Sequence, residues 1–453
     1  MRQRSAASPA TSGPARPAGP AGLRARRSVR RLVAVLTGAL LLAAAPATSA
    51  EPAHGGPDSA PWTGTWASAP TETPASVTAE FEDETIRQTV RTSIGGDRVR
   101  IRLSNEFGSG PLVIGEARVA RPADGGPSSR IDPRTDRPLT FSGRTSVTVP
   151  AGAPMLSDPV SLKVPAGTDL VVSIHLPRST RGSTLHSMAL QRNYVAAGNV
   201  TGRAAIEPTA TIDRWYFLTG VSVSTARPSS AVVTLGDSIT DGADTDVDAN
   251  HRWPDFLSGR LRAPGGPDAV GVLNQGISGN RLLHDPNPPA GSDAENFAAH
   301  FGQSALRRFD RDVASQPGAE HLIVLLGVND IGQPGTVAPE SERVTAADLI
   351  DAHRQIIARA HDRGLKAYGG TVLPFKGDTL GFYSPENEAA RQALNHWIRT
   401  GGEYDAVIDF DRALRDPSDP QRLLARYDSG DHLHPNDAGA EALAQAVPLR
   451  LLR

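Results

Sequence analysis

The sequence predicts two regions of different fold class: a β-sandwich or jelly roll over residues 61–227, and a doubly wound α/β domain over residues 228–453. Two observations predict this division. In the first region, short apolar runs alternate with turns rich in Gly, Pro and Asp, and no helical stretch intervenes. In the second region, continuous apolar runs alternate with helical patterns, which is typical of a parallel sheet covered on both faces.

The clearest strand of the first region lies at residues 98–103. Arg alternates there with Val, Ile and Leu, and this period of two buries one face of a strand and leaves a stripe of arginines on the solvent side. Further short runs of the same kind lie between turn signals, at residues 112–114, 146–149, 160–164 and 170–176. Many short strands without helices favour a sandwich or jelly roll.

The second region has longer elements. Apolar runs that predict buried strands lie at residues 231–235, 321–326 and 406–410. Helical patterns lie at residues 346–363, 386–399 and 437–447. Because ligands of such folds bind beyond the carboxyl ends of the strands, we expect the functional residues in the loops that follow them.

The first fifty residues have the order of a secretory signal peptide. Residues 1–31 contain eight arginines and no acid, residues 32–45 are largely apolar, and small residues lead to Ala50. The apolar run is too short to span a bilayer, so an uncleaved anchor is the weaker alternative. We therefore expect cleavage near Ala50, a linker over residues 51–60 and a secreted protein, with general or twin-arginine export both open.

Composition excludes several classes of function. Without residues 1–50 the chain has 39 basic and 49 acidic residues, an acidic balance that argues against nucleic acid as a partner and against anionic membranes. The chain has no cysteine, which excludes disulfides, Cys-bound metals and a thiol nucleophile. We expect no cofactor, no stable membrane insertion and a monomer.

Four polar segments are candidates for the site, and they lie at residues 236–240, 274–280, 326–331 and 431–435. A serine is a poor nucleophile until a base takes its proton, and Asp431 and His434 can supply an orienting acid and a base from one loop. The backbone amides of Ser238 and Gly279 and the side-chain amide of Asn329 can stabilise an oxyanion. Taken singly, Ser238 is equally suited to cap a helix and Asn329 to fix a turn.

These segments resemble, in order, the four consensus blocks of the SGNH (GDSL) hydrolase superfamily. The resemblance covers about residues 231–453 and implies a flavodoxin-like three-layer α/β/α domain and metal-independent ester hydrolysis through an acyl-serine. It implies Ser238 as nucleophile, Asp431 and His434 as its acid and base, and Ser238, Gly279 and Asn329 as the oxyanion hole. The first region looks like the β-rich N-terminal part of larger secreted bacterial members, several of which are thought to deacetylate plant polysaccharides.

The function expected from the sequence is therefore that of a secreted serine esterase acting on a small-molecule or polysaccharide ester. A carbohydrate O-acetylesterase or a general short-chain esterase is favoured. A lipase or phospholipase, an acyltransferase of the same family and a non-catalytic glycan-binding protein remain the alternatives. No metal is expected, because His432 and His434 lack an evident third ligand.

Overall fold

The computed structural model describes residues 61–453 except 78, 127 and 268, and these residues belong to one compact unit. The predicted signal peptide, its cleavage near Ala50 and the linker over residues 51–60 lie outside the described residues. None of the helices in the described part has an apolar stretch long enough to cross a bilayer. The division into two domains at residues 227 and 228 stays a prediction.

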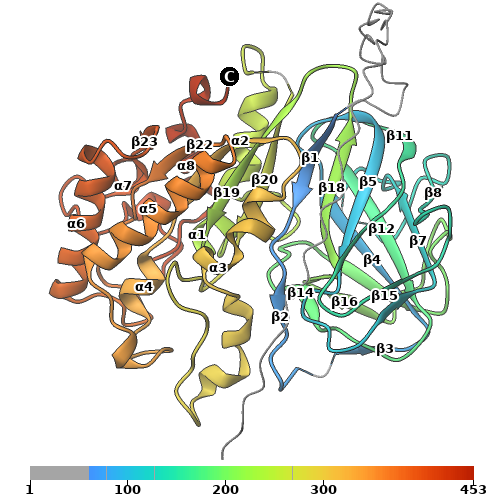
Figure 1. Ribbon diagram of the computed structural model, residues 1–453, viewed down its shortest axis with the longest axis horizontal. Helices are drawn as coiled ribbons and strands as arrows, with labels where there is room; N and C mark the ends of the chain where they lie inside the picture. The colour runs from blue at the N-terminus through green and yellow to red at the C-terminus, as the bar shows by residue number, and fades with distance from the viewer. Residues whose placement is uncertain (1–60, 78, 127, 268) are drawn as a thin grey trace, which may run out of the picture. The chain divides into compact units, whose positions relative to one another are not determined.

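The β-rich half contains two antiparallel sheets that share one hydrophobic core (Figure 1). The first sheet has the order β1-β18-β5-β10, with β11 also paired to β5, and consists of β1 (Trp62–Ala67), β18 (Leu218–Ser224), β5 (Gly96–Ser104), β10 (Pro154–Leu156) and β11 (Val160–Val164). The second has the order β16-β15-β4-β12-β7-β8 and consists of β16 (Ala210–Ile212), β15 (Asn193–Ala197), β4 (Glu84–Arg91), β12 (Asp169–Leu176), β7 (Glu116–Ala120) and β8 (Arg137–Pro138). This arrangement confirms the predicted β-sandwich.

Smaller antiparallel pairings accompany the two sheets. They are formed by β3 (Glu80–Phe81) with β13 (Thr180–Arg181), by β6 (Leu112–Ile114) with β9 (Val147–Val149), and by β14 (Thr184–His186) with β2 (Thr71–Glu72) and β17 (Trp215–Tyr216).

The arginines of β5 are partly exposed, whereas the apolar residues between them are buried. Arg100 lies over the ring of Trp62, with its guanidinium carbon 4.3 Å from the ring centroid. Arg102 donates to the hydroxyl of Ser315 at 3.1 Å, and burial lowers the pKa of Arg102. The predicted alternation is therefore confirmed, although the ring of Trp62 and, at Arg102, the α/β half cover part of the arginine face.

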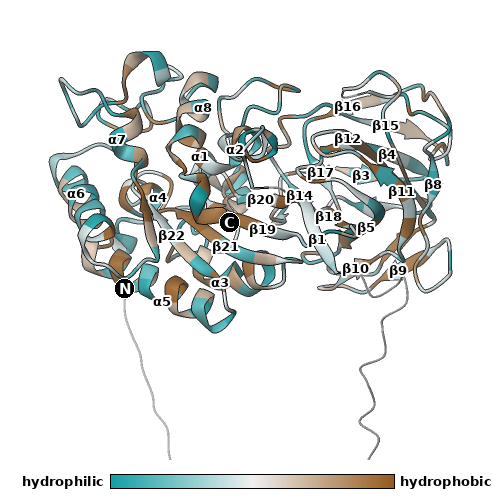
Figure 2. Cartoon of the chain, turned by 90° about the horizontal axis from the view of Figure 1, so that it is seen from above, coloured by the Kyte–Doolittle hydropathy of each residue, from teal (hydrophilic) through white to brown (hydrophobic). Residues whose placement is uncertain are grey.

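The α/β half contains a five-stranded parallel sheet with helices on both faces (Figure 2). Its strands follow the order β20-β19-β21-β22-β23, and they are β20 (Val270–Gly276), β19 (Ser230–Gly236), β21 (Ala319–Leu325), β22 (Lys366–Gly370) and β23 (Ala406–Ile408). In chain order this is 2-1-3-4-5, the flavodoxin-like arrangement, so the predicted fold class is confirmed.

Two strands of this sheet, β20 and β22, carry weak sequence signals. β20 contains Asn274 and Gln275 where the sequence indicates a loop, and β22 contains Gly369 and Gly370. Both strands are formed because their neighbours bury them, which overrides a low β-propensity. The predicted run 406–410 is also divided, because Asp409 caps a helix that begins at Phe410.

Two groups of helices cover the sheet, as Figure 2 shows with α2 and α8 on one face and α3 and α5 on the other. The helices are α1 (Ser238–Asp241), α2 (Trp253–Arg262), α3 (Ala305–Phe309), α4 (Val328–Gly332), α5 (Ala346–Asp362), α6 (Pro385–Thr400), α7 (Phe410–Leu414) and α8 (Asp437–Ala446). The three predicted helices correspond to α5, α6 and α8. Each starts at a side-chain cap, provided by Thr345, Ser384 and Asn436.

The two halves meet along β1, which lies between β18 and β20 (Figure 1). The amide of Gly64 on β1 donates to the carbonyl of Pro317 at 2.8 Å. The amide of Val272 on β20 donates to the hydroxyl of Ser93 at 2.9 Å. The edge strand of the parallel sheet is thus covered by the β-rich half.

Candidate active site

The predicted site residues gather at the carboxyl-end edge of the parallel sheet. The register places Gly236 of β19 beside Gly276 of β20 and beside Leu325 of β21. Each of these strands is followed by one of the polar segments recognised in the sequence. The edge is therefore the place where ligands of this fold class bind.

Ser238 is the first residue of α1, directly after β19. Asp237 caps this turn, since its carboxylate accepts from the amide of Ile239 at 3.1 Å. Burial raises the pKa of Asp237 to about 7, although this hydrogen bond and the nearby His434 oppose the shift. In the first turn the amide of Ser238 has no intrahelical acceptor, so it can donate to a ligand.

Ser238, His434 and Asp431 form one continuous hydrogen-bonded chain. Nε2 of His434 lies 2.8 Å from Oγ of Ser238, and Nδ1 of His434 lies 2.5 Å from Oδ2 of Asp431. The other oxygen of Asp431 accepts from the amides of Leu433 at 2.9 Å and His434 at 2.8 Å. The loop after Asp431 thus folds back on that carboxylate and points the imidazole at Ser238.

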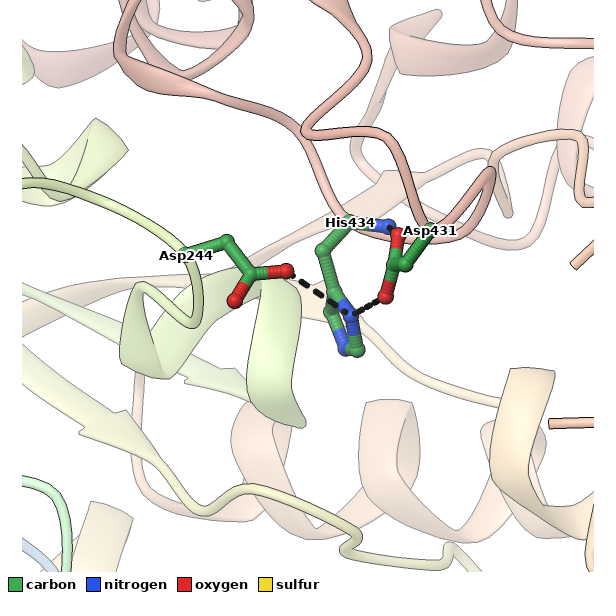
Figure 3. Close-up of side chains that lie close together, drawn as sticks. All are labelled: Asp244, Asp431 and His434. Carbon is green, nitrogen blue, oxygen red and sulfur yellow. Dashed lines mark hydrogen bonds and ion pairs between the residues drawn. The ribbon is translucent and has the colours of Figure 1, made fainter. Parts of the chain in front are cut away.

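A second carboxylate, which the sequence reasoning missed, approaches the same imidazole from the opposite side. Figure 3 shows Asp244 and Asp431 on either side of His434. Oδ2 of Asp244 lies 3.6 Å from Nδ1 of His434. The hydroxyl of Ser429 lies 3.0 Å from both carboxylates and links them. No motif singles out Asp244, because it lies in the loop after α1, far along the chain from His434.

The charges around His434 favour its protonated form. Burial alone would lower the pKa of His434, but the hydrogen bond and charge of Asp431, followed by the charges of Asp244 and Asp237, outweigh burial and raise it. Burial alone would raise the pKa of Asp431, but its bonds to His434 and to backbone amides hold that pKa far below its usual value. Asp431 therefore stays ionised wherever His434 titrates.

Gly279 lies in the loop after β20 with a φ of +78°, a conformation that side chains rarely adopt. A Cβ atom at this position would also overlap the ring of Phe301. The carbonyl of Gly279 accepts from the side-chain amide of Gln333 at 2.7 Å. Only glycine fits this turn, and the residue after α4 holds it in place.

Asn329 and Asp330, both on α4, hold the same loop. The side-chain amide of Asn329 donates to the carbonyl of Asn280 at 3.1 Å, and its second hydrogen remains for a ligand. The buried carboxylate of Asp330 accepts from the amides of Leu282 at 2.7 Å and Leu283 at 2.9 Å. Asp330 therefore shapes the loop, while Asn329 can also face the reacting atoms.

Arg308 is a structural residue of the site that the sequence reasoning missed. Its fully buried guanidinium donates to the carbonyl of Gly236 at 3.0 Å, to the carbonyl of Gln275 at 2.8 Å and to the side chain of Asn280 at 3.0 Å. Asp312 balances its charge at 3.1 Å. Arg308 thus ties together the ends of β19 and β20. An arginine in a helical pattern gives no signal of such burial.

Two groups of acidic residues and histidine are close enough to hold a metal ion in geometric terms. They are Asp244 with Asp431 and His434, and Asp246 with His251 and Asp437. In both groups Nδ1 of the histidine already forms a hydrogen bond with a carboxylate, and His432 does the same with Asp428. Hydrogen bonding accounts for these contacts, and we assign no metal to them.

In a comparison with known protein families, residues 234–442 match the GDSL-like lipase/acylhydrolase family. The uncharacterized esterase YxiM of Bacillus subtilis (strain 168) is 29% identical over 147 residues, which cover 30% of this chain and 35% of that protein. The chain therefore spans about a third of the length of that curated relative.

Solved structures with lower identity also match. An aryl esterase of M. smegmatis is 17% identical, with a TM-score of 0.36 and coverage of 50% of this chain and 99% of that one. Est24, a carbohydrate acetylesterase of Sinorhizobium meliloti, is 14% identical, with a TM-score of 0.35 and coverage of 48% and 96%.

Proposed function

Since residues 234–442 belong to the GDSL-like lipase/acylhydrolase family, we propose that this protein is a serine ester hydrolase that forms an acyl-enzyme on Ser238. The observation that carries the proposal is the hydrogen-bonded chain from Ser238 through His434 to Asp431. A serine, a base and a buried or half-buried acid in this order are the arrangement required to activate a hydroxyl.

In the first half-reaction, Oγ of Ser238 attacks the acyl carbon of the ester and its proton passes to Nε2 of His434, 2.8 Å away. Nδ1 of His434 keeps its own proton in a hydrogen bond to the carboxylate of Asp431, and the charge of that carboxylate stabilises the imidazolium. The bond between the acyl carbon and the alcohol oxygen then breaks. His434 gives its Nε2 proton to that oxygen, and the alcohol leaves.

The negative oxygen of the tetrahedral intermediate needs donors that are already in place. We assign this role to the amides of Ser238 and Gly279 and to the free hydrogen of the Asn329 side chain. Gln333 and Asp330 hold the loop and the helix that carry these donors, so little reorganisation is needed when the charge develops.

In the second half-reaction, water takes the place of the alcohol. His434 removes a proton from the water, whose oxygen attacks the acyl carbon. The bond from that carbon to Oγ of Ser238 breaks, and Oγ recovers the proton from His434. The products are a carboxylic acid and free enzyme.

We propose short acyl groups, acetyl above all, on a small alcohol or a polysaccharide as the substrates. Asp244 and Asp431 make the surroundings of His434 acidic, which disfavours phosphate-bearing lipids. Across the described ranges, the exposed large hydrophobic side chains belong to four separate segments, at Leu156, Val247, Phe297 and Leu380. Scattered side chains of this kind support a dissolved or polysaccharide ester over a lipid aggregate.

We also propose that the protein is secreted. The support is the basic, apolar and small-residue order of residues 1–50. The acidic balance of the remaining chain fits a substrate that is neutral in charge.

The test is a series of p-nitrophenyl esters from acetyl to palmitoyl, with acetylated xylan beside them, measured for the wild-type protein and for Ser238→Ala. We expect the highest kcat/KM at acetyl, and a loss of at least about 10³-fold in kcat for Ser238→Ala. The matched control is Ser418→Ala, at an exposed serine in the loop after α7. Retained turnover in Ser238→Ala would refute the role of Ser238, and an optimum at palmitoyl would refute the proposed substrate class.

A further inference from the structure

The β-rich half supplies a buried side chain to the edge of the sheet where the site lies. We propose that His186, on β14, positions the catalytic machinery by holding Asp241 and, through Asp241, Ser278. This inference rests on the proposed esterase function. Nε2 of His186 lies 2.9 Å from one carboxylate oxygen of Asp241, and the other oxygen accepts from the amide and the hydroxyl of Ser278, both at 2.9 Å.

The pair of His186 and Asp241 is buried, with side-chain exposures of 4% and 2%. Nδ1 of His186 lies 2.9 Å from the carbonyl oxygen of Ala69, which can only accept. Each ring nitrogen of His186 therefore faces one oxygen, of Ala69 or of Asp241, and the two contacts fix the orientation of the ring. A buried pair of this kind adds little stability over apolar side chains of the same size, and its value lies in fixing one geometry.

The position of Asp241 explains what this geometry controls. Asp241 ends the single turn of α1 that Ser238 begins, and Ser278 directly precedes Gly279. One carboxylate thus joins the helix of the nucleophile to the loop of the oxyanion hole. The two segments also lie in close contact, since a Cβ atom on Gly276 would overlap the backbone of Asp241.

The two backbone donors of the oxyanion hole belong to these two segments. The amide of Ser238 starts α1, and the amide of Gly279 follows Ser278. The distance between them therefore depends on the rotamer of Asp241, which His186 fixes from the β-rich half. A misplacement of about 1 Å in such a site lowers turnover by about 10²-fold.

Other contacts between the halves remain when His186 is replaced, although the ring of Trp215 packs on His186 at 5.6 Å between centroids. The guanidinium of Arg252 donates to the carbonyls of Met188 and Ala189 and lies over Trp215, 5.4 Å from its ring centroid. His186 and Asp241 also line a cavity of about 230 Å³, so a side chain of different shape at residue 186 has room. Replacement of His186 leaves the buried carboxylate of Asp241 with its two bonds from Ser278, so we expect some loss of stability beside the effect on the site.

Two substitutions separate the contact with Asp241 from the contact with Ala69. The amide nitrogen of a glutamine reaches about as far as Nε2 of histidine, and that of an asparagine about as far as Nδ1. His186→Gln therefore keeps a donor for Asp241, whereas His186→Asn keeps a donor for Ala69. The matched control is His175→Asn, because His175 forms a 2.9 Å bond with Asp83 and lies on β12, whose partner strands belong to the β-rich half.

The measurements are kcat and KM on p-nitrophenyl acetate, and the affinity for phenylboronic acid by calorimetry, since its tetrahedral adduct with a serine occupies the oxyanion hole. We expect His186→Asn to lower kcat by about 10-fold to 100-fold with little change in KM. The Kd for the boronic acid should rise by the same factor. His186→Gln should recover most of both losses, and His175→Asn should match the wild type.

Several results would overturn the proposal. One is wild-type kcat and boronic acid affinity in His186→Asn. Another is an equal loss of kcat in His186→Asn and His186→Gln that parallels their loss of stability in urea. Such a result would show that His186 only stabilises the fold. Should His186→Asn not fold, Asp241→Asn leaves one carbonyl oxygen in place of the two carboxylate oxygens that contact His186 and Ser278, and full activity with full boronic acid affinity in that variant would also refute the inference. Wild-type protein that binds the boronic acid but hydrolyses no ester would contradict the proposed function instead.

Discussion

The two sides of the site are built in different ways. The acid–base side is local, since the carboxylate of Asp431 bonds to Ser429, Leu433 and His434, all within three residues of it. The oxyanion side is assembled from distant segments. Arg308 and Gly236 are 72 residues apart in the chain, and His186 and Asp241 are 55 residues apart.

This difference follows from what each side must do. A base has to exchange protons with substrate and water, so His434 and Asp431 lie in a loop that is only partly buried, with side-chain exposures of 13% and 24%. An oxyanion hole needs fixed dipoles in a site without reorganising solvent. Rigid placement of backbone amides requires buried partners, and these come from α4, from Arg308 and from the β-rich half.

The largest effect is expected on the acid–base side, from Asp431→Asn. An amide at this position no longer fixes the tautomer of His434 or balances the imidazolium, so we expect a loss of about 10⁴-fold in kcat with the fold intact. The measurement is steady-state turnover of p-nitrophenyl acetate, with stability in urea as the check on folding. The control is Asp351→Asn, at an exposed ion pair with Arg354 on α5, which should stay within a few-fold of wild type.

Near-wild-type turnover in Asp431→Asn would mean that Asp244 takes over as the orienting acid. The 3.6 Å separation between Asp244 and Nδ1 of His434 argues against this, because it is longer than a hydrogen bond.

The next effect is expected on the oxyanion side, from Arg308→Met. This change leaves Asp312 buried with one partner fewer and frees two carbonyl groups at the strand ends. We expect the free energy of unfolding to fall by about 3–5 kcal/mol. The measurement is urea unfolding. Arg354→Met, at an exposed ion pair with Glu403, should leave the free energy of unfolding nearly unchanged, and similar losses in both variants would refute the structural role of Arg308.

The smallest effect is a shift in pH dependence from Asp244→Asn. His434 must be neutral to accept the proton of Ser238, so activity rises as the pH passes upward through the pKa of His434. That pKa is raised by the charges of Asp431, Asp244 and Asp237, with Asp431 the strongest. Loss of the Asp244 charge therefore lowers the pKa of His434. The rising, acidic part of the pH–rate profile should move to lower pH by up to about one unit.

The pH–rate profile of kcat/KM at low ionic strength tests this shift. High salt should reduce the difference between Asp244→Asn and the wild type, because Asp244 is half-exposed and its charge is screened. If the acidic part of the profile stays in place or moves to higher pH, Asp244 does not raise the pKa of His434.

What could be predicted from the sequence follows the same division between local and distant contacts. Asp431 and His434 are recognisable because their spacing and their bonds lie within one loop. The parallel sheet and α5, α6 and α8 are recognisable because apolar runs and caps are local signals.

Residues held by distant partners leave no such signal. Arg308 lies in a charged segment that looks like a surface helix in the sequence, and His186 lies in a short strand of the other half. Both side chains are nevertheless buried beside the site. Asp244 and Ser429 meet only when the loop after α1 reaches the loop before His434. The roles of these residues depend on tertiary packing, so they can be assigned only from the three-dimensional structure.

The most direct test of the central claim is to trap the covalent intermediate. p-Nitrophenyl acetate is mixed with the wild-type protein, the reaction is stopped in acid within a few turnovers, and peptides are analysed by mass spectrometry. We predict one acetyl group on the peptide that contains Ser238, and none in Ser238→Ala. Acetyl on another residue, or hydrolysis that continues in Ser238→Ala without any adduct, would contradict a mechanism through Ser238.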